Sequence, residues 1–302
     1  MKLKLKTIIT FAGLGFASSV LAEEDKKPMF ANDSEIHLFE LSINDGEYTL
    51  KNGRNISNNP DYDSQPYFSP ENNSLFFSSA RDGKQTDIYE YNIKTESLTQ
   101  ITKTAHSEFS PKPVGNTGNV SYVSEGNNPY NTVWHIDKNT SKEEWLLNST
   151  EPVGYYQANH ETGDVLFWSR YGWSVKYLNT KTNDNRFVSG NALPSSPQQI
   201  PNTNNFSFVH RQTNSMHWIK SFNPQAFSIT HIAPIFDSNY EYAWAPNGDI
   251  LRFNENRLSV WKQGNKDFKW LIGQDLSDLI KGRIARLTVS SNGKYLALVE
   301  SK

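Results

Sequence analysis

A four-strand pattern recurs along the chain with a period of about 45 residues, and this repeat constrains the fold more than any other feature. Successive units are offset by 45, 45, 41, 45 and 45 residues. The equivalent positions, here called the anchor positions, are Gln65, Ser110, Tyr155, Ser196, Glu241 and Arg286. Each anchor position precedes a turn and an apolar run rich in β-forming residues, such as LFFSS at 75–79. A four-stranded unit of this size is typical of one blade of a β-propeller.

The two ends of the chain each carry half of a unit. The last unit stops after its second strand, at residues 296–300, whereas residues 35–40 and 46–50 have the pattern of third and fourth strands. Pairing the two halves completes a sixth blade and leaves no long open sheet edge. The sequence therefore predicts an all-β fold, a six-bladed β-propeller with four-stranded blades over residues 35–302, closed by the N- and C-terminal strands.

Residues 1–22 have the composition of a secretory signal peptide. A basic start, MKLKLK, precedes the apolar run TIITFAGLGFASSV, and Val20-Leu21-Ala22 forms a cleavage site before the acidic residues 23–25. The alternative is an N-terminal membrane anchor, but the apolar run is shorter than a spanning helix. We expect cleavage after Ala22, a flexible segment over residues 23–34, and a periplasmic or secreted protein that is soluble, spans no membrane and is a monomer.

The composition excludes several classes of function. The chain has no cysteine, which excludes thiol catalysis and zinc sites that use cysteine. Its net charge is −2 and it has no basic stripe, so a nucleic-acid partner is not expected. The chain also has no Gly-X-Ser-X-Gly motif, which argues against a serine hydrolase.

The first full unit resembles the repeat of TolB-type propellers. The resemblance rests on the Ser69-Pro70 turn, the segment Ser79 to Gly83, and the strand start Asp87-Ile88-Tyr89. The stretches AWAPNGDIL and LTVSSNGKYLALV resemble the same repeat. This resemblance implies contact with a protein partner through one face of the propeller. TolB carries an additional α/β domain before its propeller, which we do not expect here.

The candidate binding site is the mouth of the central channel at which the inner strands begin. Because side chains alternate along a strand, the anchor positions and the residues two places earlier are expected to face the channel. The candidate ligand- or partner-binding residues are Asp63, Gln65, Glu108, Tyr155, Glu241 and Arg286. We expect Glu241 and Arg286 to form an ion pair. Asp63 and Glu108 are expected nearer to solvent on neighbouring blades, where they repel unless a cation or a basic partner group lies between them.

Two functions fit this site. The first is an exported, non-enzymatic binding module without a cofactor, whose partner is a protein or peptide of the cell envelope. The alternative is a metal-dependent hydrolase or lyase with calcium or another divalent cation in the channel, bound by oxygen atoms of Asp63, Glu108, Asn239 and Glu241. Oligogalacturonate lyases also use TolB-like propellers, but this sequence has no histidine cluster at equivalent blade positions. No catalytic residue is predicted, and Trp244 is expected to be buried between blades.

Overall fold

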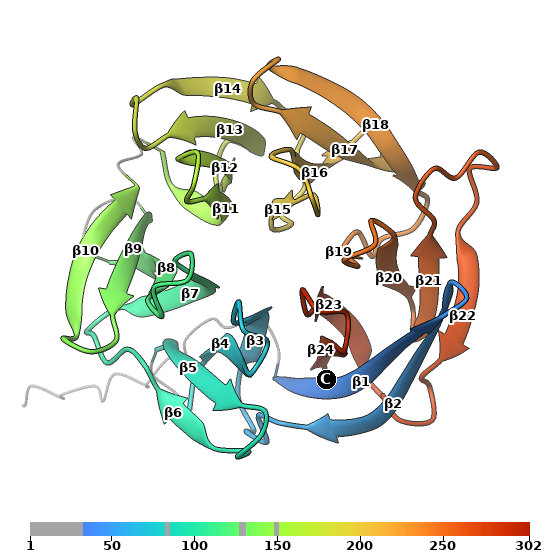
Figure 1. Ribbon diagram of the computed structural model, residues 1–302, viewed down its shortest axis with the longest axis horizontal. Helices are drawn as coiled ribbons and strands as arrows, with labels where there is room; N and C mark the ends of the chain where they lie inside the picture. Colours follow the sequence, from blue (N-terminus) through green and yellow to red (C-terminus); the bar gives the residue numbers. More distant parts are fainter. Residues whose placement is uncertain (1–32, 82–84, 127–130, 148–150) are drawn as a thin grey trace, which may run out of the picture.

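The computed structural model describes residues 33–302 apart from 82–84, 127–130 and 148–150. The predicted signal peptide and nearly all of the predicted flexible segment, residues 1–32, lie outside the described residues. The described residues form six four-stranded antiparallel sheets arranged in a ring, with no helix among them (Figure 1). The predicted all-β, six-bladed propeller is therefore confirmed. This part of the chain has no helix long and apolar enough to cross a membrane.

Five blades are continuous in sequence, each running from an inner to an outer strand. Blade 1 comprises β3 (Asp63–Phe68), β4 (Ser74–Ser79), β5 (Asp87–Asn92) and β6 (Leu98–Gln100). Blade 2 comprises β7 (Ser107–Pro113), β8 (Val120–Glu125), β9 (Thr132–Asp137) and β10 (Lys142–Leu147). Blade 3 comprises β11 (Val153–Asn159), β12 (Asp164–Ser169), β13 (Ser174–Asn179) and β14 (Asn185–Ser189). Blade 4 comprises β15 (Gln198–Gln199), β16 (Phe206–Arg211), β17 (His217–Asn223) and β18 (Ser228–Ile235). Blade 5 comprises β19 (Ala243–Trp244), β20 (Ile250–Asn254), β21 (Arg257–Trp261) and β22 (Leu271–Asp275).

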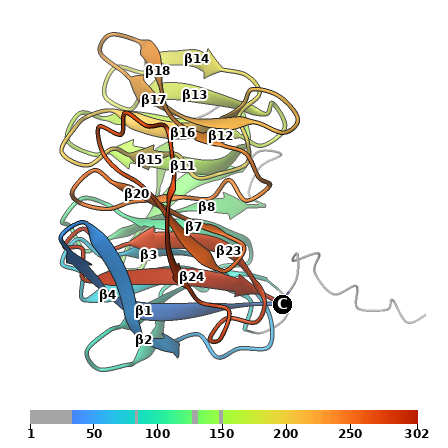
Figure 2. The same cartoon turned by 90° about the vertical axis from the view of Figure 1, so that its right-hand side faces the viewer.

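Blade 6 is built from both ends of the described chain and closes the ring. Its strands are β23 (Arg283–Val289), β24 (Tyr295–Ser301), β1 (Ser34–Asn44) and β2 (Glu47–Asn55). Strand β1 pairs with β24 along its first seven residues, and the two strands lie side by side in both views (Figures 1 and 2). The predicted closure is confirmed. Strands β1 and β2 from the start of the chain complete the blade that β23 and β24 begin at its end.

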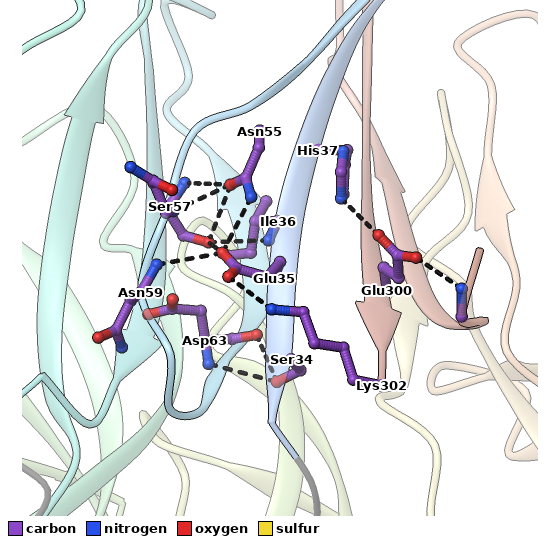
Figure 3. Close-up of polar contacts among 12 residues, drawn as sticks. Ser34, Glu35, Ile36, His37, Asn55, Ser57, Asn59, Asp63, Glu300 and Lys302 are labelled. Atoms are coloured by element: carbon purple, nitrogen blue, oxygen red, sulfur yellow. Dashed lines mark hydrogen bonds and ion pairs between the residues drawn. The ribbon is translucent and has the colours of Figure 1, made fainter. Parts of the chain in front are cut away.

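A buried polar cluster reinforces this closure (Figure 3). The Glu35 carboxylate accepts hydrogen bonds from Asn55 Nδ2 at 3.1 Å, Ser57 Oγ at 2.9 Å and the Asn59 amide at 3.2 Å. The Lys302 ammonium lies 3.0 Å from its other oxygen. Burial alone would raise the pKa of Glu35, but the hydrogen bonds, led by that of Lys302, lower it overall. The charged carboxylate therefore ties β1 to the segment after β2 and to the C-terminus.

Hydrophobic clusters pack neighbouring blades face to face. Phe76 of blade 1 and the fully buried Tyr122 of blade 2 belong to one such cluster. Equivalent clusters fill the other five interfaces, including the one between blade 6 and blade 1. Two buried tyrosines also bond to the preceding blade, since Tyr156 and Tyr242 each donate to a serine hydroxyl at 2.7 Å. Each blade is thus stabilised by both of its neighbours.

Removing residues 295–302 is expected to abolish cooperative unfolding. The deletion removes β24, so β1 and β23 lose their shared partner and the ring acquires an open edge. Urea unfolding followed by circular dichroism tests this expectation. The control is Lys142→Ala, which removes an ion pair with Glu144 whose side chains are 70% and 52% exposed and should cost less than about 1 kcal/mol. A truncated protein with the wild-type unfolding midpoint would contradict the closure.

Candidate functional site: the central channel

A β-bulge lies at or beside the anchor position in four inner strands. The pairing register shifts around Gln65 in β3, Ser110 in β7, Tyr155 in β11 and Arg286 in β23. Gln65 and Ser110 have φ angles of 59° and 54°, a region that non-glycine residues seldom occupy. A bulge inserts an extra residue and re-aims side chains. These bulges therefore decide which side chains of the inner strands reach the channel.

The channel contains a cavity of about 640 Å³. Figure 1 shows that the channel is surrounded by the inner strands β3, β7, β11, β15, β19 and β23. All six anchor positions line the cavity. Many other lining residues belong to turns between the first and second strands of the blades, including Ser69-Pro70, Gly115-Asn116 and Ser290-Ser291. The side of the ring that carries these turns is here called the turn face. The cavity thus extends from the anchor positions toward the turn face, whereas the predicted mouth lies at the other end of the inner strands.

A polar network joins anchor positions of several blades. One Arg286 nitrogen lies 3.3 Å from Glu241, as expected from the sequence, and another donates to the Tyr155 hydroxyl at 2.7 Å. The Arg286 guanidinium also stands 4.9 Å from the centre of the Tyr155 ring. Elsewhere in the ring, Gln65 Oε1 accepts a hydrogen bond from the Ser110 amide at 2.6 Å. Blades 3, 5 and 6 therefore meet through Arg286, and blades 1 and 2 through Gln65.

Burial and the neighbouring charges together set the pKa values of this network. Burial raises the pKa of Glu241, and the charges of Arg286 and Arg283 only partly oppose that rise. Burial alone would lower the pKa of Arg286, but Tyr155, Glu241 and Tyr62 raise it above its usual value. Arg286 therefore remains a cation, and the nearest carboxylate is that of Glu241.

A second cation in the cavity, Lys112, was not predicted from the sequence. It is only 6% exposed, and its ammonium lies 4.1 Å from the centre of the Tyr67 ring and 6.0 Å from that of Tyr156. Burial, assisted by the charge of Arg286, lowers its pKa to about 7. The signal available in the sequence was its position two residues after the anchor position Ser110, between two prolines. That spacing places Lys112 on the channel side beyond the bulge.

Asp63 and Glu108 do not reach the cavity, so their prediction as solvent-facing neighbours that repel each other is wrong. Both are 0% exposed, and neither lines the cavity. The physical reason is the bulge, because its extra residue breaks the alternation that was used to place residues two positions before each anchor. The Glu108 carboxylate accepts hydrogen bonds from the hydroxyls of Thr102 and Thr104. Burial raises the pKa of Asp63 to about 6 and that of Glu108 to about 8.

The four residues considered as cation ligands are not brought together. Asp63 and Glu108 are buried outside the cavity, and Glu241 faces Arg286. The Asn239 amide nitrogen donates to the carbonyl oxygens of Phe253 at 2.9 Å and of Ile284 at 3.1 Å. Within residues 33–302, where described, no group of three or more histidine, aspartate or glutamate side chains is placed to hold a metal. The arrangement does not fit the predicted divalent cation.

Trp244 packs at the interface between blades 4 and 5, as expected, but it is only partly buried. It lines the cavity, and its indole nitrogen donates to the Ser207 hydroxyl at 2.9 Å. The fully buried aromatic of this region is Tyr242. The difference arises because β19 has only two residues, so the chain around the anchor position Glu241 does not follow a regular strand.

Comparison with solved structures shows the fold. Neither the protein-family models nor the curated proteins gave a match. TolB from Acinetobacter baumannii superposes with a TM-score of 0.54 at 14% identity, covering 88% of this chain and 64% of that chain. A protein assigned as TolB from Agrobacterium tumefaciens gives a TM-score of 0.63 at 12% identity, covering 90% of this chain and 99% of that chain.

Two other similar structures belong to proteins other than TolB. A chain of the nidogen/laminin complex gives a TM-score of 0.62 at 9% identity, covering 84% of this chain and 97% of that chain. Oligogalacturonate lyase from Vibrio parahaemolyticus gives 0.51 at 11% identity, with coverages of 90% and 98%. At such identities the likeness concerns the fold, which is that of a TolB-like propeller.

Glu108→Gln is expected to stabilise the protein at pH 8 and to have little effect near pH 4.5. The pKa of Glu108 rises on folding from 4.5 to about 8. The contribution of Glu108 to the free energy of unfolding is therefore fully present below pH 4.5 and is lost as the pH rises through 8. Glutamine stays neutral throughout, and the gain at pH 8 should be roughly 1–4 kcal/mol. Urea unfolding at several pH values measures it. The control is Glu96→Gln, at a side chain that is 65% exposed. An equal effect at both pH values would show that the burial of Glu108 is misassigned.

Proposed function

We propose that this TolB-like propeller is an exported, non-enzymatic module that binds a protein or peptide partner of the cell envelope at its central channel. The observation that carries the proposal is the cavity of about 640 Å³, to which every blade contributes its anchor position. Cavities of this size, with apolar walls and a few placed polar groups, are the usual form of a ligand site. Turns of the turn face line the cavity, so a partner on this side of the ring would contact it.

The polar groups of the cavity favour binding over catalysis. Arg286, Glu241 and Tyr155 hold one another in place, so their polar atoms would meet a partner in a fixed arrangement. A metal-dependent lyase or hydrolase requires several free oxygen or nitrogen ligands at one point, and the candidate ligands lie apart. We therefore assign the residues of this network to the recognition of a partner.

Export is the second part of the proposal. It rests on residues 1–22, whose basic start, apolar run and small residues before the acidic segment have the pattern of a cleavable signal. A cysteine-free chain needs no disulfide formation after export, and its core is supplied by the six packed interfaces between blades. We expect a monomer in the periplasm or outside the cell.

Ser196→Trp is expected to abolish capture of the partner, because Ser196 lines the cavity and a tryptophan there fills part of it. The measurement is affinity capture from the envelope fraction of the native cell, with captured proteins identified by mass spectrometry. The control is Ser228→Trp, the same change at an exposed position of β18. Both variants should show the wild-type circular dichroism spectrum. The channel is not the site if Ser196→Trp captures the same partner at the wild-type level.

The mature protein is expected to begin at Glu23. Expression of the full chain in a bacterium, followed by separation of periplasm and cytoplasm, should give a periplasmic product whose mass corresponds to residues 23–302. The control is Ala22→Arg, which places a large charged residue at the cleavage site and should leave an uncleaved product. An uncleaved wild-type chain that stays in the cytoplasm would contradict export.

A further inference from the structure

We propose that the cavity binds a carboxylate group of the ligand against the Lys112 ammonium, an inference that rests on the proposed function. The carboxylate belongs to a peptide and comes either from an acidic side chain or from a free C-terminus. Both sources present the same anion, and the experiment below distinguishes them.

The charges that line the cavity are unequally paired. Among the described lining residues, the strong bases are Lys112 and Arg286, and the acids are Glu241 and Glu161. Glu241 is occupied by Arg286 at 3.3 Å, whereas Glu161 is exposed on the turn after β11. Within the described part of the chain, no carboxylate lies at ion-pair distance from Lys112, whose ammonium lies beside the rings of Tyr67 and Tyr156. The cavity therefore holds one cation without a counter-ion.

The position of Lys112 is unfavourable unless an anion arrives. Burying an ammonium without a partner costs free energy, and contact with two tyrosine rings recovers only part of it. The nearby positive charge of Arg286 adds repulsion, as the lowered pKa of Lys112 shows. A methionine of similar length would fill the same space without this cost. A carboxylate bound beside Lys112 in the cavity would offset the free-energy cost of burying the ammonium. It would also reduce the repulsion between Lys112 and Arg286.

The lining around this cation suits the remainder of a peptide. Three glutamines line the cavity, and each already makes a hydrogen bond within the protein: Gln65, Gln157 and Gln198. The amide oxygen of Gln157 is buried without a hydrogen-bond partner among the described residues, so it can accept from a peptide backbone N–H. Trp244, Tyr155 and Tyr67 add aromatic walls. The opening toward the turn face admits a chain end or a side chain. These features favour a peptide over a small inorganic anion, which needs neither amides nor aromatic walls.

The proposed contact has a characteristic pH dependence. With a pKa of about 7 in the free protein, Lys112 is protonated below pH 7 and must take up a proton to bind an anion above it. Affinity should then fall by up to tenfold per pH unit above pH 7. Of the other groups that line the cavity, Arg286 stays charged, and the pKa of His160 is lowered by burial, so that it is neutral over this range. A glutamate side chain stays ionised at these pH values because its pKa is about 4.3.

The test uses three acetylated tripeptides and ligand-detected NMR at pH 6.5 and pH 8.5. The first is acetyl-Ala-Glu-Ala-amide, the second replaces glutamate by glutamine, and the third is acetyl-Ala-Ala-Ala with a free C-terminus. The protein is the mature wild type, with the variants Lys112→Met, Lys112→Arg and His160→Gln. The melting of each variant is checked beforehand. Lys112→Arg guards against a general loss of fold in Lys112→Met, since arginine keeps the charge at both pH values.

At pH 6.5, a peptide with a carboxylate should bind the wild type at least tenfold more tightly than the glutamine peptide. Its affinity should fall at least fivefold at pH 8.5. Lys112→Met should lose both effects, Lys112→Arg should keep the preference and lose the pH dependence, and His160→Gln should keep the fall in affinity between pH 6.5 and pH 8.5. The stronger of the glutamate and free C-terminus peptides identifies the source of the anion.

The inference is overturned if neither carboxylate peptide binds more tightly than the glutamine peptide, or if Lys112→Met keeps the preference. Loss of partner capture in Ser196→Trp without any carboxylate preference would overturn the carboxylate contact and leave the proposed function standing. A carboxylate preference that depends on Lys112, combined with undiminished capture in Ser196→Trp, would support the contact and overturn the channel as the partner site.

Discussion

The antiparallel pairing of β1 with β24 is the interaction on which the rest of the structure depends. It joins the ends of the described chain, where the Lys302 amide also donates to the Asp33 carbonyl at 3.0 Å. Every blade is flanked by two others only because this pairing completes the sixth. The channel network requires it as well, since Arg286 of blade 6 reaches Tyr155 of blade 3 and Glu241 of blade 5. A site shared among distant blades exists only in a closed ring.

The bulges of the inner strands convert this ring into a lined cavity. A regular strand would present alternate residues to the channel, but the extra residue at Gln65 or Ser110 changes which side chains face inward. The positive φ angles of these two residues are a local cost that the surrounding structure must support. The hydrogen bond from the Ser110 amide to Gln65 Oε1 provides such support between blades 1 and 2. The bulges at Gln65 and Ser110 therefore cause both the backbone strain and the arrangement of side chains in the channel.

The sequence period was sufficient to predict the blades, the closure and the six anchor positions, because each blade must repeat the same packing against its neighbours. It was insufficient for the residues beside the anchors. Asp63 and Glu108 were misplaced because a bulge changes the alternation of side chains along a strand but does not change the number of residues between anchor positions. Lys112 was overlooked because only the anchor positions and the residues before them were considered, and the burial of Trp244 was overestimated because β19 is short. The sequence repeat predicts the strands that all blades have in common, whereas a binding site depends on the side chains that differ from one blade to the next.

Glu35, Glu108 and Lys112 represent two kinds of buried ionisable group, and the difference bears on function. Glu35 and Glu108 are surrounded by donors of the protein itself, so their burial is explained by the packing of neighbouring blades. Lys112 has aromatic rings and a cavity instead, with a second cation nearby. Groups of the first kind stabilise the ring whether or not a ligand is present. A group of the second kind gains its missing contact only from outside the chain, which is why Lys112 rather than Glu35 or Glu108 marks the place where a ligand binds.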